Sequence, residues 1–300
     1  MLTARDPEAL RRRLDAWRRD GAVGGAGDVG LVPTMGALHA GHLSLLRLAR
    51  GQVGGAARRV VVSVFVNPAQ FGPGEDFNRY PRRLEADAAE LAAAGCDLLF
   101  APEAEAIYPT GHSTFVEPAG PALGLEGERR PGHFRGVATV VCALLNLVRP
   151  EVAVFGEKDA QQLAVVRRMV RDLHLGVEIV AAPTVREADG LAMSSRNAYL
   201  APAERQAATV LHRALQAGRT AIAGGERRGD FVRRRMREVV EGEPLANLDY
   251  AEVVDAETFQ PVARVAGRVV LPIAARIGAT RLIDNLSLAA EEGEGVPRRG

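Results

Sequence analysis

Two histidines separated by two residues mark the segment of this chain with the clearest chemical potential. His39 and His42 belong to the run PTMGALHAGH at residues 33–42. Residues three apart lie on one side of a helical turn, so both imidazoles can face one ligand. Amides at a helix start bind phosphate, and Gly41 leaves room for a flat group such as a nucleobase. The run predicts a nucleotide site; two helix-capping histidines without a ligand are the alternative.

The single lysine of the chain lies in a second candidate segment. Of the 38 basic residues, Lys158 is the only lysine and the other 37 are arginines. It belongs to GEKD at residues 156–159, directly after the apolar run VAVF. An ammonium is a compact charge with three rotatable donors, whereas a guanidinium is a wide planar fork. We expect Lys158 to contact a phosphate oxygen; a solvated pair with Asp159, which would stabilise little, is the alternative.

Three further segments place polar side chains in suggestive positions. MSSRN at 193–197 offers two hydroxyls and a guanidinium, which suit a phosphate, although a serine-rich capping turn is the simpler reading. Asn67 and Gln70 follow the run VVVSVFV and could hydrogen-bond a small polar substrate, or be ordinary loop residues. His133, in PGHFRG, precedes an apolar helix and could serve only to cap it.

Composition excludes several classes of protein. The chain is 47% hydrophobic and 25% charged, which is typical of a globular protein, and its net charge is +1. A balance so close to zero argues against bulk binding to nucleic acid or to an anionic membrane. Cys96 and Cys142 fit no metal or redox spacing. With no apolar run near 18 residues and no apolar leader, we expect a cytoplasmic protein.

The elements that must position these residues follow from hydrophobic periodicity. Apolar runs alternating with amphipathic helices predict βαβ units and a parallel sheet. The expected strands are 29–32, 60–66, 97–101, 152–155 and 177–181, and the expected helices are 6–19, 42–50, 81–94, 136–148 and 161–173. PTMGALHAGH and GEKD then lie at strand-to-helix turns, where open α/β sheets bind ligands.

The pattern changes after about residue 184. Two arginine-rich helices near 203–223 and 230–241 precede strand-like segments at 249–254 and 268–277. Three hundred residues allow about two domains. We therefore expect an α/β domain over residues 1–184, with helices on both faces of a parallel sheet, and a smaller α+β domain over 185–290. A polar, disordered tail is expected over 291–300.

Five segments, taken together and in order, resemble the pantoate–β-alanine ligase family. They are PTMGALHAGH (33–42), FVNPAQFGPGEDF (65–77), RPGHFRGVATVV (130–141), FGEKDAQQL (155–163) and PTVREADGLAMSSRNAYL (183–200). Ordered agreement over several motifs is more specific than any single motif. The resemblance covers the first two-thirds of the chain densely. It implies a Rossmann-like nucleotidyltransferase domain with the HxGH signature, a smaller C-terminal lid domain and a homodimer.

The resemblance also assigns roles to individual residues. The ATP-binding positions it implies are Met35, Gly36, Ala37, Leu38, His39, Ala40, Gly41, His42, Gly156, Glu157, Lys158, Asp159, Val185, Met193, Ser194, Ser195 and Arg196. Pantoate is expected at Gln70 and Gln162, with β-alanine also at Gln70 and further substrate contacts from Asn67 and His133. The expected catalytic residues are His42, as general acid, His39 and Lys158. Two positions depart from the family. Position 40, often acidic in the family, is Ala40 here, and position 160, often tyrosine, is Ala160.

The implied reaction joins pantoate to β-alanine in two steps. The pantoate carboxylate attacks the α-phosphorus of ATP, assisted by Mg²⁺ whose ligands the sequence does not identify. The β-alanine amine then attacks the resulting adenylate and releases AMP. The partners expected are thus small molecules, with no nucleic acid and no membrane. Another HxGH nucleotidyltransferase, a class I aminoacyl-tRNA synthetase and a nucleotide sensor without turnover are the alternatives; the second lacks room here for an anticodon-binding domain.

Overall fold

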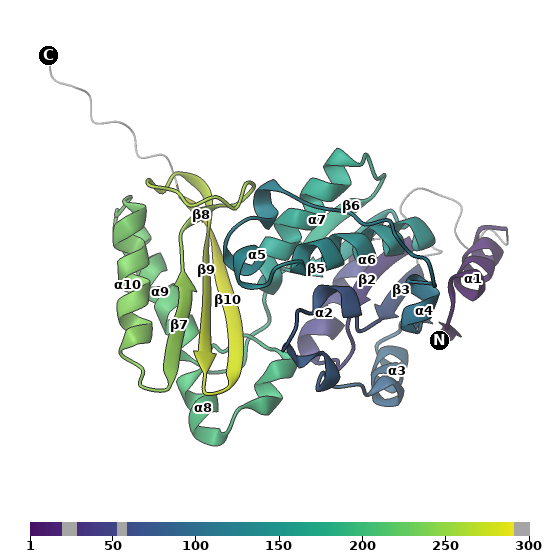
Figure 1. The fold of residues 1–300 in the computed structure, drawn as a ribbon, viewed down its shortest axis with the longest axis horizontal. Helices are drawn as coiled ribbons and strands as arrows, with labels where there is room; N and C mark the ends of the chain where they lie inside the picture. Colours follow the sequence, from purple (N-terminus) through teal and green to yellow (C-terminus); the bar gives the residue numbers. More distant parts are fainter. Residues whose placement is uncertain (20–28, 53–58, 291–300) are drawn as a thin grey trace, which may run out of the picture. The chain divides into compact units, whose positions relative to one another are not determined.

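The computed structural model describes residues 1–19, 29–52 and 59–290 of the 300-residue chain (Figure 1). The chain forms two compact units. The N-terminal unit contains residues 1–157, 161–186 and 193–195, and the C-terminal unit contains residues 158–160, 187–192 and 196 onward. The expected tail at 291–300 lies outside the described residues. Within the described ranges, no helix combines the length and the hydropathy of a membrane span.

The N-terminal unit is built on a six-stranded parallel sheet in the order β1-β4-β3-β2-β5-β6. Its strands are β1 (Leu2–Ala4), β2 (Val29–Thr34), β3 (Arg59–Val64), β4 (Leu98–Phe100), β5 (Val152–Gly156) and β6 (Glu178–Ala182). The alternation of apolar runs and helices in the sequence agrees with this arrangement, because neighbouring parallel strands need a crossover between them. The predicted α/β class is confirmed.

Helices cover both faces of this sheet. Successive side chains of a strand point to opposite faces, and the core residues divide accordingly. One core contains Leu31, Val61 and Phe155 and the other contains Val32, Val62 and Val154. The first is covered by α1 (Pro7–Arg19), α6 (His133–Val148) and α7 (Ala160–Asp172), and the second by α2 (Ala40–Gln52) and α3 (Leu84–Ala93). The unit therefore has three layers.

The strand order fixes where a ligand can bind in this unit. The central strand β2 lies between β3 and β5, so the chain moves outward on one side through β3 and β4 and returns on the other at β5. Loops that leave the carboxyl ends of two such central strands diverge and form a ligand crevice. The segment PTMGALHAGH continues from β2, and GEKD begins at the end of β5.

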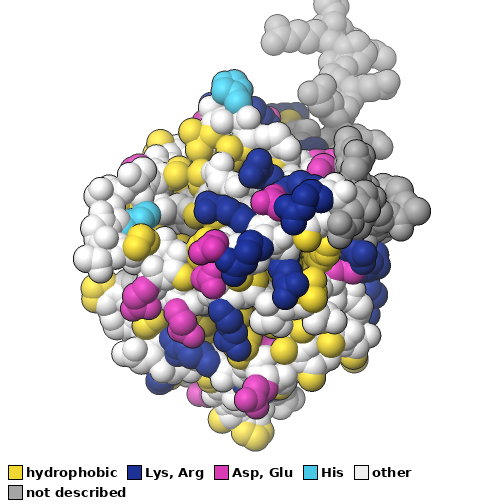
Figure 2. All heavy atoms as spheres, turned by 90° about the vertical axis from the view of Figure 1, so that its right-hand side faces the viewer, with side chains coloured by type: hydrophobic (Ala, Val, Ile, Leu, Met, Phe, Trp, Pro, Cys, Tyr) yellow, Lys and Arg dark blue, Asp and Glu magenta, His cyan; other side chains and the backbone are white. Residues whose placement is uncertain are grey.

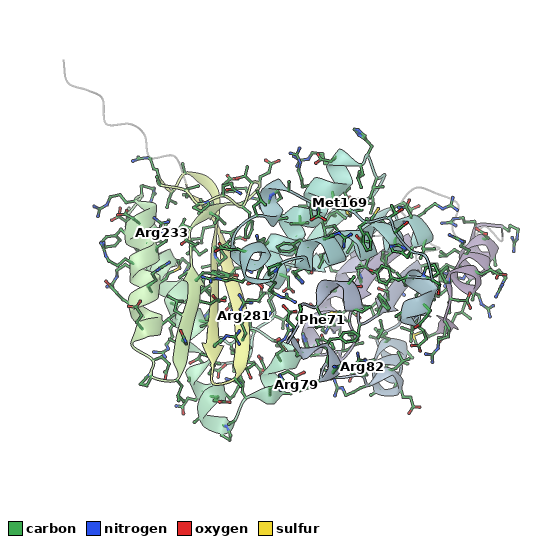
Figure 3. The ribbon with its side chains drawn as sticks, in the orientation of Figure 1. Phe71, Arg79, Arg82, Met169, Arg233 and Arg281 are labelled. Atoms are coloured by element: carbon green, nitrogen blue, oxygen red, sulfur yellow. The ribbon has the colours of Figure 1, made fainter. Side chains whose placement is uncertain are left out.

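The C-terminal unit is an antiparallel sheet with helices packed against it. The strand β9 (Gly267–Ile277) pairs with β7 (Ala246–Ala251), β8 (Val254–Asp255) and β10 (Thr280–Ala290). Its core joins apolar residues of β9 to those of α9 (Val210–Ala223) and α10 (Gly229–Glu241). On the sheet, Arg281 of β10, labelled in Figure 3, donates to Asp249 of β7 at 2.8 Å across the intervening β9.

Several elements differ from those expected. The helix expected near 203–223 is two helices, α8 (Pro202–Ala207) and α9, and the break coincides with a hydrogen bond from the Thr209 hydroxyl to the carbonyl of Gln206. Such local bonds compete with the helical pattern. The strand at 60–66 ends at Val64. The strands β1 and β10 were not expected, nor were the short helices α4 (Ala104–Ile107) and α5 (Leu125–Arg129).

Surface charge is mixed on the face that Figure 2 displays. Basic and acidic side chains lie close to one another there, as the net charge of +1 suggests. Several ion pairs among the described residues join two exposed side chains, for example Arg168 with Asp172 and Arg235 with Glu238. Pairs of this kind stabilise a protein by about 1 kcal/mol at most. The fold therefore depends on the apolar cores.

The core of the C-terminal unit offers a matched test. Leu271 of β9 is 0% exposed, whereas Leu245, in the turn before β7, is 45% exposed. We expect Leu271→Ala to lower the free energy of unfolding by about 2–5 kcal/mol, because it leaves a cavity. Leu245→Ala removes the same atoms from a partly hydrated site and should change that free energy by about 0.5 kcal/mol or less. Urea unfolding followed by circular dichroism measures both; equal losses would contradict this packing.

Candidate functional site

The loop that continues from β2 is held rigidly by hydrogen bonds to its own backbone. The amides of Ala37 and Leu38 donate to the two carboxylate oxygens of Asp87, each at 2.9 Å. Asp87 lies on α3 and is 1% exposed. Gly36 has φ +80°, and a Cβ there would lie 2.9 Å from Asp87 Oδ2. The two amides, at positions where we expected ATP, thus already have partners, and any contact there would use other atoms.

The carbonyl groups of the same loop are also bonded. Ser195 Oγ donates to the Ala37 carbonyl at 3.0 Å, and Arg83 donates to the Leu38 carbonyl at 3.2 Å. Val185 lies beside the loop as well, since a Cβ on Gly41 would be 3.9 Å from the Val185 Cβ. Within the N-terminal unit, the structure therefore brings PTMGALHAGH together with Val185 and part of MSSRN, as the sequence predicts for a common site.

His39 and His42 are oriented by the backbone at the start of α2. His39 Nδ1 accepts from the Gly41 amide at 3.2 Å, and His42 Nδ1 accepts from the His39 amide at 3.3 Å. An amide can only donate, so in the neutral rings the proton is on Nε2. The ring centroids are 4.0 Å apart. The histidines do cap the helix, and in each ring Nε2 is the nitrogen that can donate.

The structure explains the glycine at position 41 differently from the sequence, which suggested room for a flat ligand. A Cβ at this position would lie 2.8 and 2.9 Å from two atoms of the His39 ring. Such distances are shorter than van der Waals contact, so any side chain here would displace His39. The glycine is thus required by the neighbouring histidine, whether or not a flat ligand also approaches this part of the backbone.

Asn67 and Gln70 differ in the hydrogen-bonding capacity they retain. Asn67, 1% exposed, donates to Gln70 Oε1 at 3.0 Å and to the Gly136 carbonyl at 3.1 Å. Its Oδ1 accepts from the Ala69 amide and, at 2.8 Å, from the Tyr108 hydroxyl. These four bonds use the full capacity of an asparagine amide. Asn67, expected to contact substrate, is therefore engaged by the protein and orients Gln70.

The Gln70 amide keeps the capacity that Asn67 lacks. Its Nε2 lies 3.2 Å from Met35 Sδ, a weak acceptor, and its Oε1 accepts once from Asn67. By the same inventory, one N–H and one acceptor position are left. The contact with Met35 brings this side chain to the loop that continues from β2. Gln70 can therefore bind a polar substrate beside that loop.

His133 is buried behind Gln70. It is 8% exposed, its Nδ1 lies 2.9 Å from the Gln70 carbonyl, and its Nε2 lies 3.1 Å from Arg130 Nη1. A carbonyl only accepts and a guanidinium only donates, so the proton is on Nδ1. Burial, and next the charge of Arg130, lower the pKa of His133 to about 4. Both ring nitrogens, which we expected near substrate, thus have protein partners.

The segment GEKD forms a short 3₁₀ turn at Glu157–Asp159, directly after β5. Lys158 is half-buried and belongs to the C-terminal unit, where its carbonyl accepts from the buried amide of Asn285 at 2.8 Å. Within the described ranges, the Lys158 ammonium forms no ion pair, with Asp159 or any other residue. The solvated Lys–Asp pair, considered as the alternative, is therefore not formed there.

The adjacent glutamines of α7 have different surroundings. Gln161 is buried, accepts from the Glu126 amide and donates to the Pro121 carbonyl, each at 3.0 Å. It thereby holds the loop before α6. Gln162 is half-buried, as a substrate-binding side chain would be. Its proposed contact with pantoate, like those of Gly156, Glu157, Met193, Ser194 and Arg196 with ATP, stays a prediction.

Sequence reasoning missed three residues that organise these segments. Asp87 is one of three acidic residues on α3, with Glu85 and Glu90, and no spacing in the sequence distinguishes it. Arg130 is one of 37 arginines, and Asn285 lies on a strand that was not expected. Each was identified only by its burial and its partners, which depend on residues distant in sequence.

The pKa of His133 predicts a pH dependence of stability. An unfolded histidine titrates near 6.5, so the unfolded state takes up the proton first as the pH falls, and folding becomes less favourable between about pH 6.5 and pH 4. The contribution lost is roughly 3 kcal/mol, the free energy that corresponds to a pKa of about 4 in the folded state in place of 6.5. Urea unfolding at pH 7 and pH 4.5 should show a smaller decrease for His133→Asn than for the wild type. An imidazole that titrates near 6.5 by NMR would contradict this.

Comparisons with known proteins agree over nearly the whole chain. Residues 2–287 match the sequence profile described as pantoate-beta-alanine ligase. The chain is 56% identical over 275 residues to the pantothenate synthetase of Heliobacterium modesticaldum, which covers 92% of this chain and 96% of that protein. It is 55% identical over 292 residues to that of Rubrobacter xylanophilus, with 95% and 97% covered.

Solved structures give the same result. A crystal structure of pantothenate synthetase from Thermus thermophilus superposes with a TM-score of 0.86 at 50% identity, over 95% of this chain and 99% of that one. That of pantoate-beta-alanine ligase from Francisella tularensis, complexed with beta-gamma ATP and beta-alanine, gives 0.74 at 32% identity, over 95% and 97%. With this agreement in sequence and in fold, the chain belongs to the pantoate–β-alanine ligase family.

Proposed function

We propose that this protein condenses pantoate with β-alanine to form pantothenate, with ATP converted to AMP and pyrophosphate. Its membership of the family supports this most directly. One observation on the chain itself supports the proposal that it binds ATP. Two imidazoles present Nε2–H donors after the carboxyl end of the central strand β2. The Francisella relative in complex with an ATP compound and β-alanine supports the same two substrates here.

In the first step, a pantoate carboxylate oxygen bonds to the α-phosphorus of ATP as the bond to pyrophosphate breaks. Negative charge grows on the α-phosphoryl oxygens and on the leaving group. The Nε2–H groups of His39 and His42 and the ammonium of Lys158 are suited to stabilise it, which is usually the largest catalytic effect. The family resemblance implies His42 as the general acid: its Nε2–H would hydrogen-bond the leaving oxygen, and transfer of that proton would require the imidazolium form of the ring.

Gln70 and Gln162 would hold pantoate in line for that attack. Such orientation lowers the barrier because it removes the entropic cost of aligning the reactants. Gln70 has an N–H and an acceptor position to offer, and Asn67 fixes the plane of its amide. We assign the direct contact to Gln70 and the alignment to Asn67.

In the second step, the β-alanine amine attacks the acyl carbon of pantoyl adenylate, and AMP leaves. No protein nucleophile is needed. Burial, the largest cause, raises the pKa of the Cys96 thiol to about 11, which leaves little thiolate at neutral pH. Closure of the C-terminal unit over the intermediate, with Ser194 and Arg196 near phosphate, would exclude water from this mixed anhydride, which water hydrolyses. The one hydroxyl proton of Ser195, also expected near ATP, is already donated to the Ala37 carbonyl.

The described residues do not offer a preformed cage for Mg²⁺. Among the described residues, no group of three or more His, Cys, Asp or Glu side chains is arranged to hold a metal ion. This fits an ion held mainly by phosphate oxygens and water, as Mg²⁺ at nucleotide sites usually is. When bound, the ion would neutralise phosphate charge. Domain limits at 184 and 290, a homodimer and a cytoplasmic location stay predictions.

A product assay tests the proposed function. With ATP, Mg²⁺, pantoate and β-alanine present, we expect AMP and pantothenate in equal amounts, and omission of any organic substrate should abolish pantothenate formation. Pantoate with ATP alone should support exchange of labelled pyrophosphate into ATP, because the first step is reversible. Nucleotide transfer that never needs β-alanine would favour another HxGH nucleotidyltransferase, and ATP binding without any product would favour a sensor.

The lone lysine provides a sharper test. Lys158→Ala removes a charge-assisted contact made mainly in the transition state, and we expect kcat of the exchange reaction to fall on the order of 100-fold or more. Lys158→Arg keeps the charge and changes its shape, so it should also lose most activity. The control is Arg11→Lys, an arginine–lysine substitution at an exposed position of α1, which should leave the exchange reaction unchanged. Near-normal exchange by Lys158→Arg would contradict the role of ammonium geometry.

A further inference from the structure

The segment RPGHFRG, which leads into α6, has no role in the reaction scheme above beyond the contact with substrate first expected of His133. In the structure, Arg130, His133 and Gly136 all pack against the short turn at residues 67–70. This turn carries Gln70, the side chain assigned to pantoate. The contacts show how the segment controls the position of that side chain.

The turn is held at both ends, through the backbone at Gln70 and through the side chain at Asn67. The Gln70 carbonyl lies 2.9 Å from His133 Nδ1, which donates to it, and Arg130 Nη2 donates to the same oxygen at 3.4 Å. At the other end, Asn67 donates to the Gly136 carbonyl at 3.1 Å. A Cβ on Gly136 would lie 2.2 Å from the Ala69 carbonyl oxygen. The two segments thus approach as closely as a glycine permits.

The hydrogen bonds run in one direction through His133. Arg130 donates to Nε2, and Nδ1 donates to the Gln70 carbonyl. A second proton on the ring would point at the guanidinium, and the low pKa of His133 keeps that form rare at neutral pH. The ring is therefore a neutral link with a fixed tautomer. It transmits the position of Arg130 to the backbone of Gln70.

Arg130 is itself fixed by a carboxylate of the loop that follows Gln70. Its Nε and Nη2 donate to the two oxygens of Glu75 at 2.8 and 2.7 Å. Burial raises the pKa of Glu75, but the hydrogen bond and charge of Arg130 outweigh it and hold that pKa below its usual value. Bidentate pairs of this kind fix geometry as well as charge. Glu75 therefore anchors Arg130, which lies between α5 and α6, beside the turn at residues 67–70.

Aromatic packing fixes the start of the same loop. Phe71, labelled in Figure 3, directly follows Gln70 and meets Phe77 and Tyr80 edge-on at centroid distances of 5.3 and 6.0 Å. Such edge-on pairs add stability beyond the burial of their surface. The chain is thus constrained on both sides of Gln70, by the Asn67 contacts before it and by this cluster after it.

We propose that Arg130 and His133 are positioning residues for Gln70: they fix its carbonyl oxygen and thereby aim its side-chain amide at pantoate. The inference rests on the proposed function, because the ligand of Gln70 is taken from it. Neither residue needs to touch the substrate. Their effect should therefore appear in the use of pantoate and leave the use of ATP largely unchanged.

The test compares two substitutions of one residue. His133→Ala removes the donor to the Gln70 carbonyl. His133→Asn keeps a donor, since its Nδ2 occupies nearly the place of the imidazole Nδ1. We expect His133→Ala to raise the KM for pantoate about tenfold, the effect of one lost hydrogen bond, with the KM for ATP changed by less than about twofold. His133→Asn should recover most of the loss.

A matched control separates positioning from general loss of stability. Thr139, two turns further along α6, is buried; its Oγ1 accepts from the Val116 amide at 3.0 Å and donates to the Arg135 carbonyl. Thr139→Val removes these bonds with little change of shape, and neither bond involves the 67–70 turn. It should lower the melting temperature and leave both KM values unchanged.

The outcomes distinguish failure of the proposed function from failure of the positioning role. If the wild type forms no pantothenate, the proposed function fails whatever the variants do. If it does, an unchanged pantoate KM in His133→Ala, an equal rise for ATP, or no recovery in His133→Asn overturns the positioning role. Should His133→Ala fail to fold, Arg130→Lys replaces it; that variant keeps the charge, loses the bidentate geometry and should raise the pantoate KM selectively.

Discussion

The candidate site depends first on two hydrogen bonds from consecutive amides to one buried carboxylate. Asp87 accepts from Ala37 and Leu38, each at 2.9 Å, at the point where the chain leaves β2. A buried charge is costly unless it is bonded, and an amide facing the interior is costly for the same reason. The hydrogen bonds between the amides and the carboxylate offset the cost of burying both. This pairing lets the chain pass from β2 into α2 through left-handed residues, Gly36 and Ala37.

The histidines show how a backbone partner decides whether an imidazole can serve a ligand. His39 and His42 each accept an amide proton at Nδ1, so Nε2 carries the proton and is directed away from that bond. His133 donates from Nδ1 to a carbonyl and accepts at Nε2, so neither nitrogen is left for a substrate. The residue type is the same in all three. The difference lies in whether the nearest backbone group is a donor or an acceptor, and this follows from the fold.

Much of the fold could be predicted because its strands and helices depend on local patterns of apolar residues. The run VVVSVFV indicated a strand buried on both faces, and β3 is one. The strand β10 was missed because Asp284 and Asn285 interrupt its apolar pattern, although both side chains are buried. Their burial depends on partners far away in sequence; Asn285, for example, donates to the Lys158 carbonyl. No window of sequence around Asn285 contains that information.

The candidate site divides in the same way. Motifs indicated the segments that carry Gln70, His42 and Lys158, but the role of each neighbour depends on the direction of its hydrogen bonds. Gln161 and Gln162 are adjacent and identical in type. Gln161 is buried and holds a loop by hydrogen bonds, whereas Gln162 is only half-buried. The turn at residues 67–70 gives the clearest case. Asn67 was expected to contact substrate; its four bonds to protein leave the contact to Gln70, whose own backbone is fixed by α6. A substrate-binding amide is oriented most precisely when the surrounding protein satisfies every group except the one that meets the ligand.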